Sequence, residues 1–143
     1  MKKLFALISI LASGSAFAID DAEVIQKLGP AWVSLEEKAV KLVGPDYHKL
    51  IVDAAFANVA SSACPGVTLN GEEMDKRFNQ MVAEKGGNAP EDQRTFIVKA
   101  TTLYGTYLGL LLSESYLDTP VFCKHVEHAQ ANKQHPNPFW KIK

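Results

Sequence analysis

Two histidines near the C-terminus have the spacing that comes closest to a metal-binding motif. His125 and His128 are three residues apart with Glu127 between them, so on a helix both rings lie on one face. His135 follows and could supply a third ligand. The chain lacks the i, i+4 histidines and the placed glutamate of an HExxH hydrolase. We therefore expect solvated surface histidines, no metal site and no enzymatic activity, and keep a small metal-dependent hydrolase as one alternative.

The two cysteines are the second pair whose chemistry matters. Cys64 and Cys123 are the only thiols, and no CxxC spacing points to a redox or thiolate-metal site. In an exported protein, two cysteines most simply form one disulfide. The chain-entropy model assigns about 4 kcal/mol of stabilisation to a closed loop of about 60 residues. We expect this bond to be a main source of stability.

The first eighteen residues have the pattern of a secretory signal peptide. Lys2 and Lys3 precede an apolar stretch over residues 4–11, and small residues end at Ala18, which is the order a signal peptidase requires. We expect cleavage after Ala18 and export through the inner membrane, to the periplasm or to the extracellular medium. No segment has the roughly 18–20 uninterrupted apolar residues of a membrane span, so no transmembrane helix is expected.

Charge and motif content exclude several function classes. Lys and Arg number 15 against 16 Asp and Glu, a balance that argues against a nucleic-acid partner. The chain contains no P-loop, dinucleotide fingerprint or EF-hand pattern. We therefore expect no cofactor.

The elements that must position these residues are predicted to be helices. Apolar residues recur at steps of three and four along the chain, and Gly and Pro separate the segments. No alternating run is long enough to predict a sheet. The expected fold is all-α, a compact bundle of about five helices in a domain over residues 19–131, tied by one disulfide. The predicted helices cover residues 19–43, with an interruption at Gly29 and Pro30, and residues 46–63, 70–85, 90–116 and 119–131.

Two glycines lie inside the longest predicted helix. Gly105 and Gly109 form a GxxxG step, a spacing that lets two helices approach closely. We expect this step to pack against the alanine-rich helix over 46–63. A homodimer seam on the same groove is the alternative.

The C-terminal segment is basic and aromatic. Residues 132–143 contain two prolines and are expected to form an extended tail, with Phe139 and Trp140 near its end. Basic groups beside an interfacial aromatic suit an anionic surface such as lipid head groups. The alternative is that these aromatics fold back onto the bundle. The candidate anionic-surface residues are Lys124, His125, His128, Lys133, Trp140, Lys141 and Lys143.

Together these patterns favour a binding protein. The leading interpretation is an exported helical protein that acts on a protein partner in the periplasm, as a chaperone, inhibitor or immunity protein does, through a helix groove or a dimer surface. The alternatives are a secreted protein that engages anionic lipid or a host surface through its basic C-terminal region, and the hydrolase described above.

Overall fold

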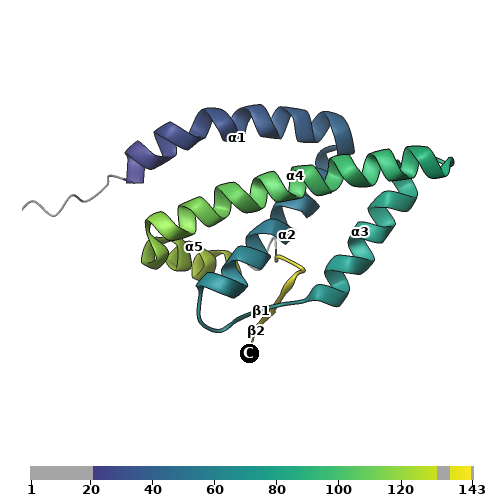
Figure 1. Ribbon diagram of the computed structural model, residues 1–143. Helices are drawn as coiled ribbons and strands as arrows, with labels where there is room; N and C mark the ends of the chain where they lie inside the picture. The colour runs from purple at the N-terminus through teal and green to yellow at the C-terminus, as the bar shows by residue number, and fades with distance from the viewer. Residues whose placement is uncertain (1–20, 132–135, 143) are drawn as a thin grey trace, which may run out of the picture.

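All five predicted helices are present, and the all-α fold class is confirmed. The computed structural model describes residues 21–131 and 136–142. The predicted signal peptide over 1–18 lies outside these residues, as do Lys133, His135 and Lys143. In chain order, the elements are α1 (Asp21–Val43), α2 (Pro45–Ala63), β1 (Val67–Leu69), α3 (Gly71–Lys85), α4 (Pro90–Leu117), α5 (Thr119–Ala131) and β2 (Trp140–Ile142) (Figure 1).

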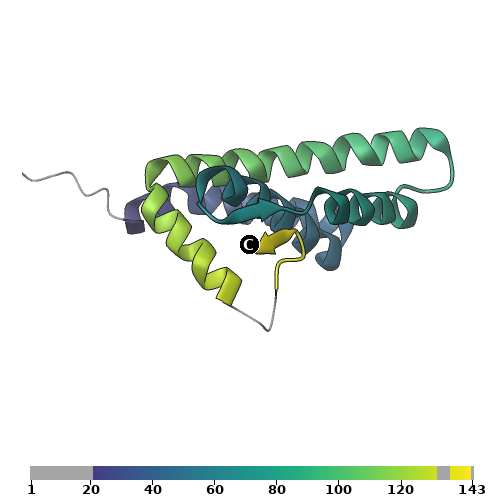
Figure 2. The ribbon, with the colours of Figure 1, turned by 90° about the horizontal axis from the view of Figure 1, so that it is seen from below.

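Helices α2 and α4 form the centre of the bundle. Helix α4 runs the length of the molecule, and α2 lies against one side of it (Figures 1 and 2). Leu103 and Tyr107 of α4 share the core with α2. Because alanine side chains are short, they allow the two helices to pack closely. The fully buried small residues of α2 are Ala54, Ala55, Ala57 and Ala60.

Helix α1 is continuous, so the interruption predicted at Gly29 and Pro30 is wrong. Pro30 lies inside the helix, where its missing N–H removes one backbone hydrogen bond. A helix can absorb this loss as a bend, and α1 arches over α4 (Figure 1). Three residues that follow Pro30 hold α1 against the core. Trp32 packs on the core, and Ala39 and Val43 are buried in it.

The C-terminal segment is part of the fold over residues 136–142, and the expectation of no sheet is wrong. Strands β1 and β2 pair antiparallel, with Leu69 opposite Trp140. The Asn70 N–H donates to the Phe139 carbonyl over 2.7 Å, and the Phe139 side chain is fully buried. Three-residue strands from distant parts of the chain are too short to show the two-residue alternation that predicts a sheet.

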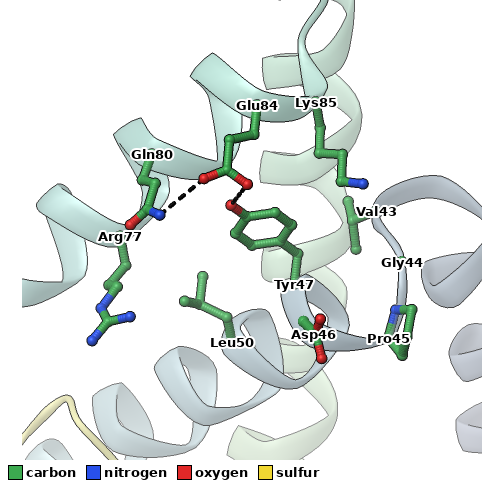
Figure 3. A pocket seen from close by; sticks show the side chains of 10 residues that line it. All are labelled: Val43, Gly44, Pro45, Asp46, Tyr47, Leu50, Arg77, Gln80, Glu84 and Lys85. Atoms are coloured by element: carbon green, nitrogen blue, oxygen red, sulfur yellow. Dashed lines mark hydrogen bonds between the residues drawn. The ribbon is translucent and has the colours of Figure 1, made fainter.

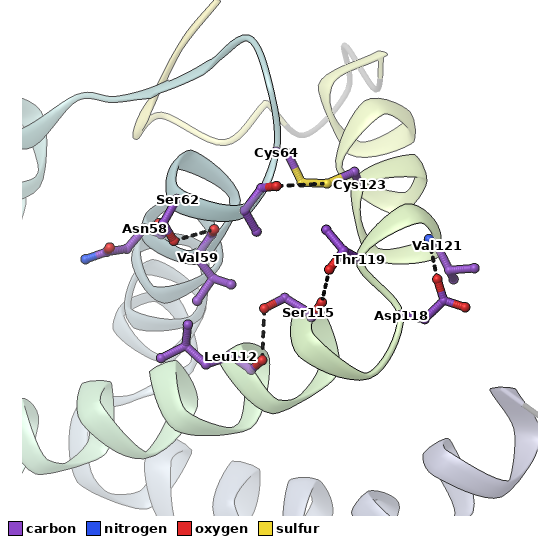
Figure 4. Close-up of a disulfide and its surroundings, with 11 residues drawn as sticks. Asn58, Val59, Ser62, Cys64, Leu112, Ser115, Asp118, Thr119, Val121 and Cys123 are labelled. Carbon is purple, nitrogen blue, oxygen red and sulfur yellow. Dashed lines mark hydrogen bonds between the residues drawn. A yellow bond between two sulfur atoms is a disulfide. The ribbon is translucent and has the colours of Figure 1, made fainter. Parts of the chain in front are cut away.

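The predicted disulfide is confirmed. Cys64, just after α2, is bonded to Cys123 in the first turns of α5, and 59 positions separate them in the sequence. Figure 4 shows this bond beside the corner where α4 turns into α5. At that corner the Thr119 hydroxyl donates to the Ser115 carbonyl over 2.7 Å. The disulfide therefore ties the end of α2 to the helix that follows α4.

Candidate functional site: the outward face of helix α4

The side of α4 that points away from α2 is an exposed stripe that runs along most of the helix. Its residues recur at steps of three and four positions, so they share one face. Figure 2 shows α4 along the upper edge of the molecule, with no other element of the described chain outside it. We name this stripe the α4 face, and its exposed residues are Val98, Thr102, Gly105, Gly109, Ser113 and Tyr116.

The two glycines lie on the α4 face, so the prediction that they pack against α2 is wrong. A Cβ atom added to Gly105 or Gly109 would meet no atom within 4 Å. The buried side of α4 instead carries larger residues, including Leu103, Tyr107 and Leu111. The small residues in the core that α2 and α4 share are Ala55 and Ala60 of α2 and Ala100 of α4, not the two glycines.

Large apolar side chains lie at the two ends of the α4 face. Val98 is 60% exposed and Tyr116 is 82% exposed. Ile97 and Leu117, next to them in the sequence, are 44% and 50% exposed. The α4 face therefore has a small, weakly polar middle and one large exposed apolar side chain at each end.

Two hydroxyl groups of the α4 face, those of Thr102 and Ser113, are hydrogen-bonded within the helix. The Thr102 hydroxyl donates to the Val98 carbonyl over 2.8 Å, and the Ser113 hydroxyl donates to the Gly109 carbonyl over 2.9 Å. No charged residue occurs between Lys99 and Glu114. Burying a hydroxyl is costly only when it loses its partner, so the Thr102 and Ser113 hydroxyls can be covered without becoming unpaired donors.

Polar contacts to α1 and α2 fix the rotation of α4 about its axis. The Tyr107 hydroxyl lies 2.8 Å from His48 Nε2 of α2. The Asn58 side-chain amide, also of α2, donates to the Tyr104 hydroxyl over 2.7 Å. Burial raises the pKa of Tyr107 to about 12, and the charge of Glu36 adds to the shift, so this phenol keeps its proton at neutral pH.

The contact between α4 and α1 also fixes the rotation of α4 about its axis. The Trp32 indole N–H donates to Glu114 Oε1 over 3.0 Å, and the Trp32 ring lies 5.4 Å from the Tyr107 ring. With α2 holding one flank and α1 another, the glycine-bearing side of α4 is the side left open.

Helix α4 is also the one described helix that is long and apolar enough to cross a membrane by length and composition. Its residues Phe96, Ala100 and Leu103 are buried in the bundle. This packing explains why the buried side of α4 is apolar. It does not explain why the exposed α4 face has no charged residue between Val98 and Tyr116 except at its flanks.

The histidine pair lies on a different surface. His125 and His128 are exposed on α5, as are Lys124 and Glu127. Among the described residues, no group of three His, Cys, Asp or Glu side chains could hold a metal ion. The third histidine of the predicted set, His135, is outside the described residues.

The aromatic residues predicted for an anionic surface pack onto the bundle. Trp140 is partly buried, and its ring lies 5.6 Å from that of Phe56. Its indole N–H has no hydrogen-bond partner in the described chain. Lys141 lies in β2 opposite Thr68. Trp140 is therefore a residue of the sheet whose ring packs onto the bundle.

A cleft of about 350 Å³ lies between the start of α2 and helix α3 (Figure 3). The Tyr47 hydroxyl donates to Glu84 Oε2 over 2.5 Å, and Gln80 donates to Glu84 Oε1 over 2.9 Å. These bonds lower the pKa of Glu84, and the bond to Glu84 raises the pKa of Tyr47 to about 12. Both carboxylate oxygens of Glu84 accept hydrogen bonds from within the protein, and Arg77 pairs with Glu73. We therefore interpret the residues around this cleft as the contact that holds α2 against α3.

Sequence reasoning identified the glycines of the α4 face but missed its direction and its large residues. Spacing alone places Val98 and Tyr116 on the same side as Gly105 and Gly109, which is a signal that could have found them. No family model matches this chain, and neither does a curated protein or a solved structure.

Proposed function

We propose that this chain is an exported helical protein that binds a protein partner through the α4 face and has no enzymatic activity. One observation carries the proposal: the central helix leaves an exposed side without charged residues, on which the Thr102 and Ser113 hydroxyls are bonded within the helix. The Cys64–Cys123 disulfide supports an oxidising compartment such as the periplasm.

The shape of the α4 face favours a helix as the element that binds it. Gly105 and Gly109 form a shallow centre, and Val98 and Tyr116 rise at its two ends. A partner helix laid along this stripe would approach the backbone of α4 at the glycines and bury the two end residues. Each 100 Å² of apolar surface removed from water contributes about 2.5 kcal/mol, so the ends would supply most of the affinity.

Photo-crosslinking in the producing cell tests this proposal. A photoreactive amino acid replaces Thr102 on the α4 face, and the same amino acid replaces Asn79, which is exposed on α3, as the matched control. We expect a discrete protein adduct from position 102 and none from position 79.

A substitution that fills the glycine centre should remove the adduct. Gly105→Arg places a long cation on the α4 face, and Gly29→Arg makes the same change on α1, where an added Cβ also meets no atom within 4 Å. We expect loss of crosslinking only with Gly105→Arg. Equal crosslinking from positions 79 and 102, or an adduct that survives Gly105→Arg, would contradict the proposal.

A further inference from the structure

We propose that the partner of the α4 face is a second copy of this chain, with the two α4 helices antiparallel and a two-fold axis between Gly105 and Gly109. This inference rests on the function proposed above and names the partner. In a two-fold interface the same patch is used twice, so residue i of one copy meets residue j of the other, and j meets i. The α4 face must then match itself when reversed.

The order of residue sizes along the α4 face is symmetric. Val98 lies seven positions before Gly105, and Tyr116 lies seven positions after Gly109. Thr102 and Ser113, both small, lie three positions before and four positions after the same glycines. Antiparallel pairing therefore sets Gly105 against Gly109 and Val98 against Tyr116 of the second copy.

Parallel pairing fits the same residues less well. It sets Val98 against Val98 at one end and Tyr116 against Tyr116 at the other, so the distance between the helices would have to differ at the two ends. Antiparallel pairing gives the same valine–tyrosine contact twice. It also places each helix dipole against the opposite end of its neighbour.

Charge separates the two arrangements as well. Arg94 is exposed one helical turn before Val98, on the same side of the helix. In the parallel arrangement the two Arg94 side chains meet each other. In the antiparallel arrangement each one lies beyond Tyr116 of the second copy, near Asp118, a carboxylate that also accepts the Val121 N–H.

The size of this contact predicts a weak dimer. At 1.5 Å per residue the stripe from Val98 to Tyr116 is about 27 Å long. One helix pair of that length buries less than about 1,200 Å², the size class of transient complexes. We expect a dimer that dissociates on dilution through the micromolar range.

Sedimentation equilibrium of the purified exported protein, from low to high micromolar concentration, tests the inference. We expect a monomer–dimer equilibrium that Gly105→Arg weakens at least about tenfold and that Gly29→Arg leaves unchanged. Circular dichroism and the melting temperature, measured on each variant, separate loss of dimer from loss of fold.

A pair of charge substitutions tests the antiparallel register. Val98→Glu alone and Tyr116→Lys alone should each weaken the dimer, because each leaves a charge against an apolar residue. The V98E/Y116K double variant should recover dimerisation, since antiparallel pairing sets the new acid against the new base twice. Parallel pairing would instead set like charges together, and a double variant weaker than both single variants would overturn the register.

Two results would overturn the second copy as the partner. One is a protein that stays monomeric at high micromolar concentration, while the crosslink from position 102 captures a different protein; the proposed function would then stand without this inference. The other is a monomer that floats with uncharged phosphatidylcholine vesicles and loses this binding with Gly105→Arg, which would identify lipid as the occupant.

Discussion

Helices α2 and α4 both carry small residues at helical spacing, and the fold uses them in opposite ways. Ala55 and Ala60 of α2 are fully buried, whereas Gly105 and Gly109 of α4 face open space. A small residue permits a close approach on whichever side it lies. In α2 that approach is made inside the molecule by α4, and we propose that on α4 it is made by a partner from outside.

The two helices also differ in how their polar groups are satisfied. Asn58 and His48 of α2 bond across to the tyrosines of α4. The Thr102 and Ser113 hydroxyls on the α4 face bond back to their own helix. The first pattern fixes neighbours within a fold, and the second leaves a face that is ready to be covered at low cost.

Removing the disulfide should produce the largest effect, because this bond ties the end of α2 to α5, the helix that follows α4. With Cys64→Ser and Cys123→Ser together, the chain-entropy model predicts a loss of about 4 kcal/mol in the free energy of unfolding. Urea denaturation of the double variant and of the unmodified protein, both at concentrations where the monomer dominates, measures it. A change below about 1 kcal/mol would show that the end of α2 stays beside α5 without the covalent bond.

Enlarging a small residue should change the free energy of unfolding in opposite directions in the two helices. Ala55→Leu in α2 inserts methylene groups into a filled interior and should lower the free energy of unfolding by about 1–3 kcal/mol. Gly109→Ala on the α4 face should raise it by about 0.5–1 kcal/mol, because alanine favours the helix and meets no neighbour. The same urea titration measures both variants. Destabilisation by Gly109→Ala would mean that the α4 face is covered within the monomer.

The smallest expected change in stability comes from the contact between α2 and α3, which does not involve α4. Tyr47→Phe removes the main hydrogen bond that lowers the pKa of Glu84, so this pKa should rise toward its usual value. Because folding lowers the pKa, the contact stabilises the fold above the unfolded pKa of the carboxyl group, and this contribution is lost as the pH falls through the folded value. Carbon-detected NMR titration of the Glu84 carboxyl measures the shift. An unchanged pKa would show that Tyr47 does not hold this carboxylate in solution.

Most of the helical framework could be predicted from local signals. Gly44, Gly66 and Gly87 adopt positive φ angles of 82°, 80° and 79°, and each ends or separates a helix where the sequence shows Gly beside Pro or Gly. The disulfide followed from a count of two thiols. The helix ends depend on residues that are close in the chain. The disulfide depends on there being a single second cysteine for each thiol to bond.

The remaining features depend on contacts between distant residues. The pairing of Leu69 with Trp140 has no local pattern. Continuity of α1 through Pro30 depends on packing, which outweighs one missing hydrogen bond. The direction of Gly105 and Gly109 depended on which side of α4 the alanines of α2 would meet, and the larger residues Leu103 and Tyr107 decided it by burying more apolar surface.

The central claim is that the α4 face, and no other surface, makes the intermolecular contact. Amide NMR spectra of the exported protein, recorded at low and high micromolar concentration, test it most directly. We expect concentration-dependent shifts at Val98, Gly105, Gly109 and Tyr116, with the amides of α3, and those of α5 beyond its first turn, unchanged. Shifts that cluster on α5, or spectra that do not change with concentration, would contradict it.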